Sequence, residues 1–289
     1  MYSYQLQQWL LFFFIYCFIG WCWESAYVSA KKREWVNRGF LKGPFLPIYG
    51  FGALAVLVST LPFRPYPLLV CFFGMLGATL LELVTGICME KLFHVRYWDY
   101  SNQKFNFKGH ICLSSSVAWG FFSLAMIYGF HKPIEGLVLL LPDWLTNLFS
   151  LVLTAAVAGD FAVSFKTAME LRDILDGMER IKSEMKRLQK RAEVIEAFLA
   201  DSAEKKTEEL RTEMRERRED VREELHQIRE RQQQYLLHAK SGIGRNISVE
   251  HMLKRNPGAV SSRYAAAFRE YKDQIIAEIR EEIQERRKK

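Results

Sequence analysis

The sequence predicts an all-α protein: a polytopic membrane helix bundle of about five transmembrane helices, followed by a long cytoplasmic helical tail of the coiled-coil type. One reason is the charge distribution, because residues 1–165 hold only 11 of the 40 Lys and Arg and 8 of the 33 Asp and Glu. A second reason is that the same part contains apolar runs of about 20 residues, long enough to cross a bilayer core. We therefore expect a transmembrane domain over 1–165, a coiled-coil or helical segment over 166–240 and C-terminal amphipathic helices over 241–289.

The first two expected spans are separated by a basic loop. Residues 9–28 form an apolar run with no Lys or Arg before it and no small-residue cleavage site after it, which favours a retained span over a signal peptide. The loop over 31–43 contains Gly and Pro residues that prevent a regular helix. A second, shorter span is expected from about 48 to 61, and the prolines that follow it indicate a tight turn.

Three further spans are expected over 68–93, 111–130 and 144–165. An aromatic and polar loop over 94–109 separates the first two of them. The apolar segment between the last two, residues 131–143, is too short to cross a bilayer, so we expect it to lie in the membrane interface.

The positive charges of the loops predict how the bundle is oriented. The loops over 31–43 and 91–108 together carry nine Lys and Arg, whereas the links at the other end carry only Arg64 and Lys132. The positive-inside rule therefore predicts a multi-pass protein of the cell membrane with its N-terminus outside and its C-terminus, including the tail, in the cytoplasm. We expect the outer half of the bundle to hold almost nothing ionisable.

Acidic residues within the apolar spans are the first candidates for function. A charged side chain inside hydrocarbon costs about 2.5–3.5 kcal/mol on insertion scales, so such residues are rarely present without a role. Glu24 and Glu90 have basic residues nearby and are expected to pair with them, whereas Glu82 lies deeper and has no adjacent cation. With this topology, the candidate substrate-binding residues all lie at the cytoplasmic side: Glu24, Asn37, Arg38, Glu82, Glu90, Trp98, Asp99, Tyr100, Asn106 and His110.

The loop over 98–110 allows two interpretations. Its aromatic residues alternate with Asp, Ser and Asn, which is the composition of a shallow polar site at headgroup level. The same composition is also found in an interfacial belt that only anchors a loop.

Several kinds of chemistry receive no support from the sequence. No G-x-x-x-x-G-K-[ST] loop occurs, so any ATP-driven step would need a nucleotide-binding subunit on another chain. The five cysteines show neither C-x-x-C spacing nor a neighbouring His cluster, so we expect no metal site and no cofactor. The net charge of +7 is divided between the two parts of the chain, which gives no argument for nucleic acid and suits a position beside anionic lipids.

The tail begins with a heptad pattern. Apolar residues between 174 and 199 follow one another in alternating steps of four and three, which is typical of a coiled coil. They are Ile174, Met178, Ile181, Met185, Leu188, Ala192, Ile195 and Leu199. A dimeric coil, an antiparallel hairpin with residues 203–237 and a continuous rod would all show this pattern. Two more amphipathic helices are expected over 248–255 and 261–287, separated by Asn256-Pro257-Gly258.

Five motifs carry a resemblance to a known family. They are GWxxES (20–25), NRGFLKGPFLPIYG (37–50), LE-x-x-TG-x-x-ME (81–90), WDYS (98–101) and FN-x-x-GHICL (105–113), the last followed by Trp119-Gly120. In this order over roughly residues 1–165, they resemble the putative ABC-transporter type IV permease family (CmpB-like) of bacterial membrane proteins. The resemblance implies a transport component. The chain departs from importer permeases in lacking their E-A-A…G docking loop, for which AAVAGD (155–160) is a poor substitute.

Three functions therefore stay open. The first is a membrane transport component with a polar site open to the cytoplasm and no ATPase of its own. The second is a membrane-embedded enzyme acting on a lipid or lipid-linked substrate, with Glu82, Asp99 or His110 as acid–base groups. The third is a membrane-anchored sensor or scaffold that uses the tail. The expected partners are membrane lipids, a separate nucleotide-binding subunit, and a second copy or another protein bound through the seam over 174–199.

Overall fold

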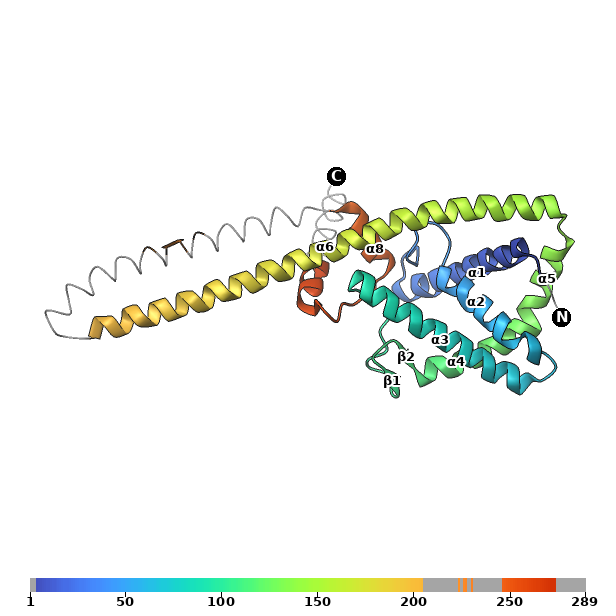
Figure 1. Ribbon diagram of the computed structural model, residues 1–289, viewed down its shortest axis with the longest axis horizontal. Helices are drawn as coiled ribbons and strands as arrows, with labels where there is room; N and C mark the ends of the chain where they lie inside the picture. The colour runs from blue at the N-terminus through green and yellow to red at the C-terminus, as the bar shows by residue number, and fades with distance from the viewer. Residues whose placement is uncertain (1–3, 205–222, 224–225, 228–229, 231–245, 274–289) are drawn as a thin grey trace. The chain divides into compact units, whose positions relative to one another are not determined.

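The computed structural model describes residues 4–204, 223, 226–227, 230 and 246–273. The chain divides into two compact units, one made of Met1–Arg172 with Ser248–Lys289 and the other of Asp173–Ile247. The described regular structure is helical except for one short hairpin, so the predicted all-α class is confirmed (Figure 1).

The first two helices begin and end as their sequences suggest. Helix α1 (Leu6–Lys32) has two lysines in its last turn, where the helix dipole favours positive charge, and ends at Arg33 in the left-handed conformation. Helix α2 (Pro47–Thr60) starts with a proline, which is favourable in a first turn, and continues into the 3₁₀ turn η1 (Leu61–Phe63). At 1.5 Å per residue, α2 is about 21 Å long and shorter than a bilayer core of about 30 Å.

Helix α3 (Pro67–Phe93) ends at His94, which has a positive φ and turns the chain away from the helix axis. The following loop contains the antiparallel strands β1 (Asn106–Phe107) and β2 (Ile111–Cys112). Helix α4 (Leu113–Ala125) then leads through the π-helical turn η2 (Met126–Phe130) into α5 (His131–Leu140). The segment expected as a short interfacial connection after residue 130 is a helix that follows α4 through η2, and its position in the membrane interface stays a prediction. The helix bends at η2, as π-turns commonly allow, and continues (Figure 1).

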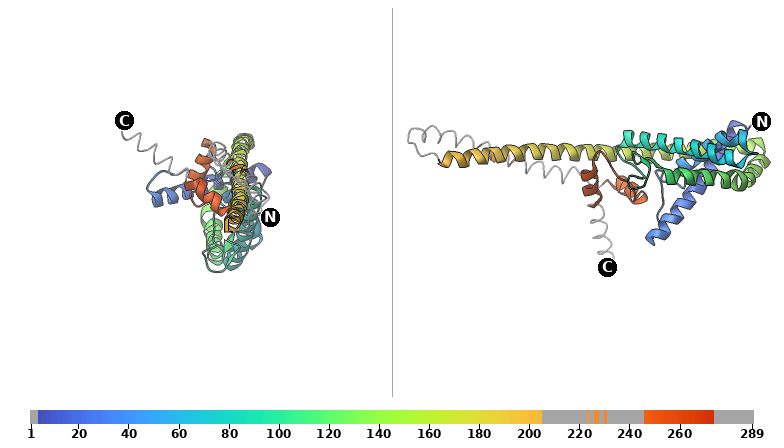
Figure 2. Two further views of the ribbon diagram at one scale, coloured as in Figure 1. Left: turned by 90° about the vertical axis from the view of Figure 1, so that its left-hand side faces the viewer. Right: turned by 90° about the horizontal axis from the view of Figure 1, so that it is seen from below.

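Helix α6 (Asp143–Glu204) is continuous through the end of the apolar sequence and into the charged tail, and Figure 2 shows it as one uninterrupted helix. Within the residues that the structure describes, four helices are long and apolar enough to cross a membrane: Leu6–Lys32, Pro67–Phe93, Leu113–Leu140 and the helix containing Asp143–Val194. The predicted second span corresponds to the shorter helix Pro47–Phe63, so the number of five spans is not confirmed and the topology stays a prediction.

We call the unit that contains Met1–Arg172 and Ser248–Lys289 the membrane unit. Its core forms where α2 packs against both α1 and α3, and where α3 packs against α4. Phe12, Val56, Leu57 and Val70 are almost completely buried within it. This arrangement places the ends of α1 and α3 and the beginning of α4 around the residues that the sequence singled out.

Helix α8 (Ile247–Arg255) covers the first of the two predicted C-terminal amphipathic helices and belongs to the same unit as the membrane helices. Residues 265–273 are helical as well, and the rest of the second predicted helix lies outside the described residues. The seam over 174–199 lies on α6. Its pairing as a coiled coil stays a prediction, and the loosely apolar stretch over 203–237 falls almost entirely outside the described part.

Candidate functional site

The carboxylate of Glu82 is the centre of what we call the interior site: Glu82, Tyr100, Ser115 and Trp119. The Tyr100 hydroxyl donates to Glu82 Oε1 at 3.0 Å, and Trp119 Nε1 and Ser115 Oγ donate to Oε2 at 3.2 and 3.4 Å. The Glu82 residue is only 6% exposed. Within the described part of the chain, no Lys, Arg or His forms an ion pair with it. These neutral donors replace the water that the carboxyl group would otherwise bind.

The local sequence explains why Glu82 points into the bundle. Residues four apart lie on one face of a helix, and the buried face of α3 repeats at this spacing. Its members are Val70, Gly74, Ala78, Glu82 and Gly86. The small residues on this face let neighbouring helices approach closely, as is common in membrane bundles. Glu82 therefore faces protein rather than lipid.

The rim network consists of Glu90, Arg96, Asp99, His110 and Ser262. Arg96 Nε lies 2.8 Å from Glu90 Oε1, and Arg96 Nη1 lies 3.8 Å from Asp99 Oδ1. His110 Nε2 lies 3.1 Å from Glu90 Oε2, and the Ser262 hydroxyl also donates to Glu90. Glu90 is therefore compensated by a cation and by additional donors, as the sequence predicts for it.

His110 is held close to α3 because Gly86 has no side chain. A Cβ at Gly86 would lie 2.9 Å from His110 Nδ1, which is closer than real contacts allow. Burial, followed by the positive charge of Arg96, lowers the pKa of His110 below its ordinary value. The imidazole is therefore neutral at pH 7, and a neutral ring that bonds to Glu90 through Nε2 must carry its proton on that nitrogen.

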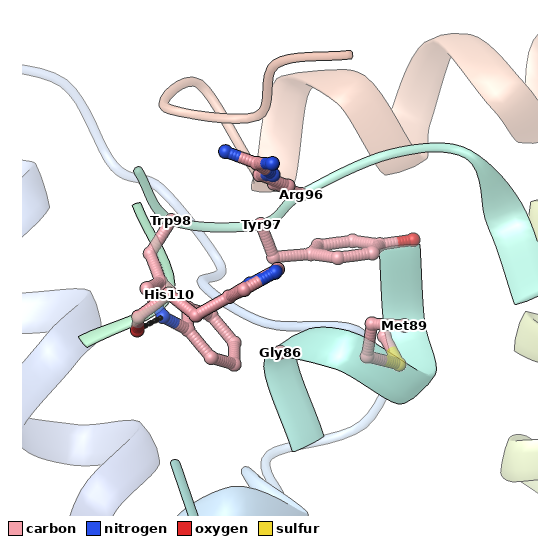
Figure 3. A pocket seen from close by; sticks show the side chains of 6 residues that line it. All are labelled: Gly86, Met89, Arg96, Tyr97, Trp98 and His110. Atoms are coloured by element: carbon pink, nitrogen blue, oxygen red, sulfur yellow. Dashed lines mark hydrogen bonds between the residues drawn. The ribbon is translucent and has the colours of Figure 1, made fainter. Parts of the chain in front are cut away.

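A small pocket lies beside Arg96 and His110 of the rim network. It encloses about 160 Å³, including open space at its mouth, and is lined by Gly86, Met89, Arg96, Tyr97, Trp98 and His110 (Figure 3). Pockets for drug-sized ligands are typically about 300–1,000 Å³. The enclosed part of this one has no space for a water molecule, so it is a packing gap at the rim rather than a ligand site. Trp98 Nε1 donates to the His110 carbonyl at 3.0 Å, which closes one side of the pocket.

Two of the candidate loop residues act within the loop itself. Asp99 Oδ1 accepts from the Ser101 amide at 3.0 Å and from its hydroxyl at 2.5 Å. Asn106 Nδ2 donates to the Gln103 carbonyl at 2.8 Å, and Asn106 Oδ1 accepts from the Gly109 amide at 3.1 Å. Asp99 and Asn106 therefore shape the loop and do not join the interior site.

Tyr100 is the loop residue that reaches the interior site. Burial, and then the adjacent charge of Glu82, raise the pKa of the Tyr100 phenol above its ordinary value of about 10. The hydroxyl therefore stays protonated and remains a donor to Glu82 at physiological pH.

Glu24, Asn37 and Arg38 form a separate group at the end of α1. Glu24 Oε2 lies 3.7 Å from Arg38 Nε, and Glu24 Oε1 accepts from the Tyr49 hydroxyl at 2.7 Å. Asn37 Oδ1 accepts from Trp21 Nε1 at 2.7 Å. The Tyr49 ring lies against Trp119 with 6.4 Å between ring centroids, so one tyrosine connects this group to the interior site.

The C-terminal segment, residues 246–273, contributes contacts that the sequence did not reveal. Arg38 Nη1 donates to Asn256 Oδ1 at 2.9 Å, and Asn256 Nδ2 donates to the Gly39 carbonyl at 3.0 Å. The backbones of Arg96 and Val260 exchange two hydrogen bonds of 2.7 and 2.9 Å. The segment therefore docks on the same loops that carry the candidate residues. The Asn-Pro-Gly break between two amphipathic helices is the one sequence signal for such a docked turn.

The opposite end of the bundle also contains ionisable groups, and the expectation that it holds almost none is wrong. Arg64 Nη2 lies 3.9 Å from Glu135 Oε2, and the Tyr4 hydroxyl donates to Glu135. The Tyr16 hydroxyl lies 3.1 Å from Nδ1 of His131, which is completely buried. The reason is that the helix continues past residue 130 and carries His131 and Glu135 onto the bundle.

Comparisons with known proteins identify the family of the chain but add no metal site and no solved relative. Among the described residues, no three His, Cys, Asp or Glu are arranged to hold a metal ion. No curated protein and no solved structure matches the chain significantly. A family model described as putative ABC-transporter type IV matches residues 11–165, which is more than half of the chain and includes every candidate residue. The chain therefore belongs to the putative ABC-transporter type IV family.

Proposed function

We propose that the chain is the permease-like, membrane-embedded component of a transport system in the cell membrane, with its polar site open to the cytoplasm and its helical tail on that side. Family membership supports a transport-related membrane protein. The four long apolar helices support its position in a bilayer. The nine Lys and Arg in the two polar loops support the orientation.

The environment of Glu82 carries this proposal. A carboxylate on a membrane helix is costly, and it is normally paired with a cation when its role is structural. Glu82 instead accepts only neutral donors from Tyr100, Ser115 and Trp119. We assign Glu82 as the polar determinant of the transport path, because an acid without a cation partner favours a cationic or protonated group on the substrate.

The other candidate residues receive supporting roles. Glu90 and His110, together with Arg96, hold the rim in shape, and Trp98 fixes the backbone of His110 through its hydrogen bond to the His110 carbonyl. Glu24, Asn37 and Arg38 connect α1 to the loop that follows it. The enzyme alternative has less support, because Asp99 is bonded to its own loop and His110 to Glu90.

We propose that a separate nucleotide-binding subunit hydrolyses the ATP that drives transport. This is the arrangement expected of an ABC-transporter component whose own sequence has no phosphate-binding loop. The Lys and Arg residues of the two polar loops, 31–43 and 91–108, offer that subunit a charged surface.

One observation favours a second role for the chain, in which the tail controls the site. The chain leaves the membrane unit at Arg172 and re-enters it at Ser248. The re-entering segment then binds Gly39, Arg38 and Arg96. A change in the tail, such as the binding of a partner, would alter the covering of the rim by this segment.

Co-purification of the full chain in mild detergent tests the proposal. We expect quantitative mass spectrometry to find a nucleotide-binding subunit enriched over a matched purification of an unrelated membrane protein. We also expect a deletion strain to show an altered metabolite profile, which the wild-type gene restores. The Glu82→Gln variant should express normally and should not restore the profile. Absence of an enriched ATPase together with an unchanged metabolite profile would contradict the proposal.

A further inference from the structure

The tip of the hairpin between α3 and α4, residues 104–108, presents two phenylalanines to the outside. Phe105 is 82% exposed and Phe107 is 52% exposed. Neither belongs to the buried clusters of the described core. Lys104 and Lys108 flank them and are exposed as well.

This exposure comes from a rigidly built turn. Phe105 and Lys108 both have φ near +50°, a conformation that is strained for residues other than glycine. Asn106 holds the turn through its bonds to Gln103 and Gly109, and β1 pairs with β2 directly behind it. The positive φ angles of this turn cost conformational energy. The exposure of the Phe105 and Phe107 rings to water is unfavourable as well.

The hairpin tip continues the lipid-facing surface of α4. Leu113, Val117 and Phe121 follow one another at intervals of four residues, lie on one face of this candidate membrane helix and are exposed. The Leu113 amide donates to the Phe105 carbonyl at 3.2 Å, so Phe105 lies directly at the beginning of this apolar face. Figure 1 shows β1 and β2 beside the first turn of α4. The tip thus lies beside the first turn of a helix that is long and apolar enough to cross a membrane.

The charges of the tip indicate which lipids it meets. Lys108 Nζ lies 5.8 Å from the centroid of the Phe107 ring, so the ammonium extends over the aromatic side chain. Aromatic rings with adjacent lysines suit the interface, where the rings lie among the headgroups and each ammonium meets a phosphate. Anionic lipids add an attraction of this kind for every Lys near the surface.

We propose that residues 104–108 form a lipid-binding wedge. Phe105 and Phe107 enter the headgroup region of the leaflet beside the start of α4, and Lys104 and Lys108 bind the phosphates of anionic lipids there. The wedge fixes how deeply the loop that contains Tyr100 and His110 lies in the bilayer. It depends on the chain lying in a bilayer and is independent of which substrate the protein transports.

Photo-crosslinking in a reconstituted bilayer tests the wedge directly. The full chain carries benzoylphenylalanine in place of Phe105, and a matched control carries it in place of Gln103, an exposed polar residue of the same loop. Both are placed in vesicles of equal parts phosphatidylglycerol and phosphatidylcholine and are illuminated. We expect lipid adducts at 105 to exceed those at 103 several-fold. Equal yields at the two positions, or crosslinks at 105 to protein alone, would overturn the proposal.

The lysines are tested in the same vesicles by the identity of the crosslinked lipid. With benzoylphenylalanine at 105, we expect phosphatidylglycerol to be enriched over phosphatidylcholine. K104Q and K108Q should each reduce that enrichment, by up to about fivefold if each lysine contributes the usual attraction to an anionic surface. K190Q, which removes an exposed lysine from the tail, should leave it unchanged. Enrichment that survives K104Q and K108Q together would show that the lysines do not bind the headgroups.

Discussion

Glu82 and Glu90 lie on the same helix, eight residues or about 12 Å apart along its axis, and have opposite surroundings. Glu90 faces the guanidinium of Arg96, the imidazole of His110 and the hydroxyl of Ser262. Glu82 faces a phenol, an indole and a hydroxyl, all of them neutral. The rim network therefore pairs its acid with a cation, whereas the interior site holds its acid with neutral donors.

The two surroundings indicate different roles for the two acids. An acid paired with a cation contributes to stability, and removing either partner costs free energy. An acid held by neutral donors costs free energy to bury, and selection retains such a group when its charge is used. We therefore propose that Glu90 serves the structure of the rim, whereas Glu82 is kept for function although its hydrogen bonds also contribute to stability.

Truncation of Glu82 should have the largest effect on folding. Glu82→Ala leaves the donors of Tyr100 and Trp119 buried without an acceptor, at about 1–3 kcal/mol for each. We expect a loss of about 3 kcal/mol in the free energy of unfolding, seen as a lower Tm of the detergent-purified protein. Glu82→Gln keeps an acceptor oxygen, so its Tm should lie between those of Glu82→Ala and the wild type. An unchanged Tm for Glu82→Ala would show that these hydrogen bonds are not formed.

The pair of Glu90 and Arg96 should show strong coupling. Each single variant, Glu90→Gln or Arg96→Gln, leaves a half-buried charge unpaired and should cost about 2 kcal/mol. The double variant should cost about 1 kcal/mol less than the sum of the two, because the interaction is lost only once. Thermal unfolding of the four proteins measures this coupling. Simple additivity would mean that the two side chains do not interact.

Asn256 should anchor the C-terminal segment. Asn256→Ala removes the bonds to Arg38 and Gly39, which contribute about 1–2 kcal/mol together. We expect faster hydrogen–deuterium exchange in residues 246–273 and 38–42, with unchanged exchange in α3. Ser262→Ala serves as a comparison, because it removes one bond at the rim and leaves Asn256 in place. Unchanged exchange in Asn256→Ala would contradict the docking of the segment.

The smallest effect is expected from acidification around His110. The pKa of His110 is lower in the folded protein than the ordinary value of about 6.5, so the unfolded chain binds more protons as the pH falls through that value. The contribution of the neutral ring is therefore complete above about pH 6.5 and is lost as the pH falls towards the lower folded pKa. Between about pH 7.5 and 5.5, the Tm of the wild type should fall further than the Tm of His110→Gln. His226→Gln, in the tail, should behave like the wild type, and equal pH dependence of His110→Gln and wild type would refute this.

Much of the fold can be predicted from the sequence, because the length of an apolar segment and the charges near it are properties of a short stretch of chain. The ranges of the long apolar helices, the pairing of Glu24 and Glu90 with nearby Arg, and the lack of a cation beside Glu82 are all visible in short stretches of chain. The interior face of α3 could also have been found, since Gly74, Ala78, Glu82 and Gly86 recur every four residues.

The remainder depends on contacts between distant segments. Asn256 and Val260 follow their partners Arg38 and Arg96 by more than 150 residues, and nothing in the local pattern connects them. The roles of Asp99 and Asn106 depend on how one loop folds back on itself. The cluster around His131 depends on a π-turn that lets the helix continue beyond the predicted end of a span.

The most direct test compares Glu82→Gln and Glu90→Gln in the deletion strain, with the amount of membrane-inserted protein measured for each. The account predicts that Glu82→Gln is present at the wild-type amount and fails to restore the metabolite profile. It predicts that Glu90→Gln is less stable but restores the profile in proportion to its amount. Full restoration by Glu82→Gln, or complete failure of Glu90→Gln at a normal amount of protein, would contradict the division between the interior site and the rim network.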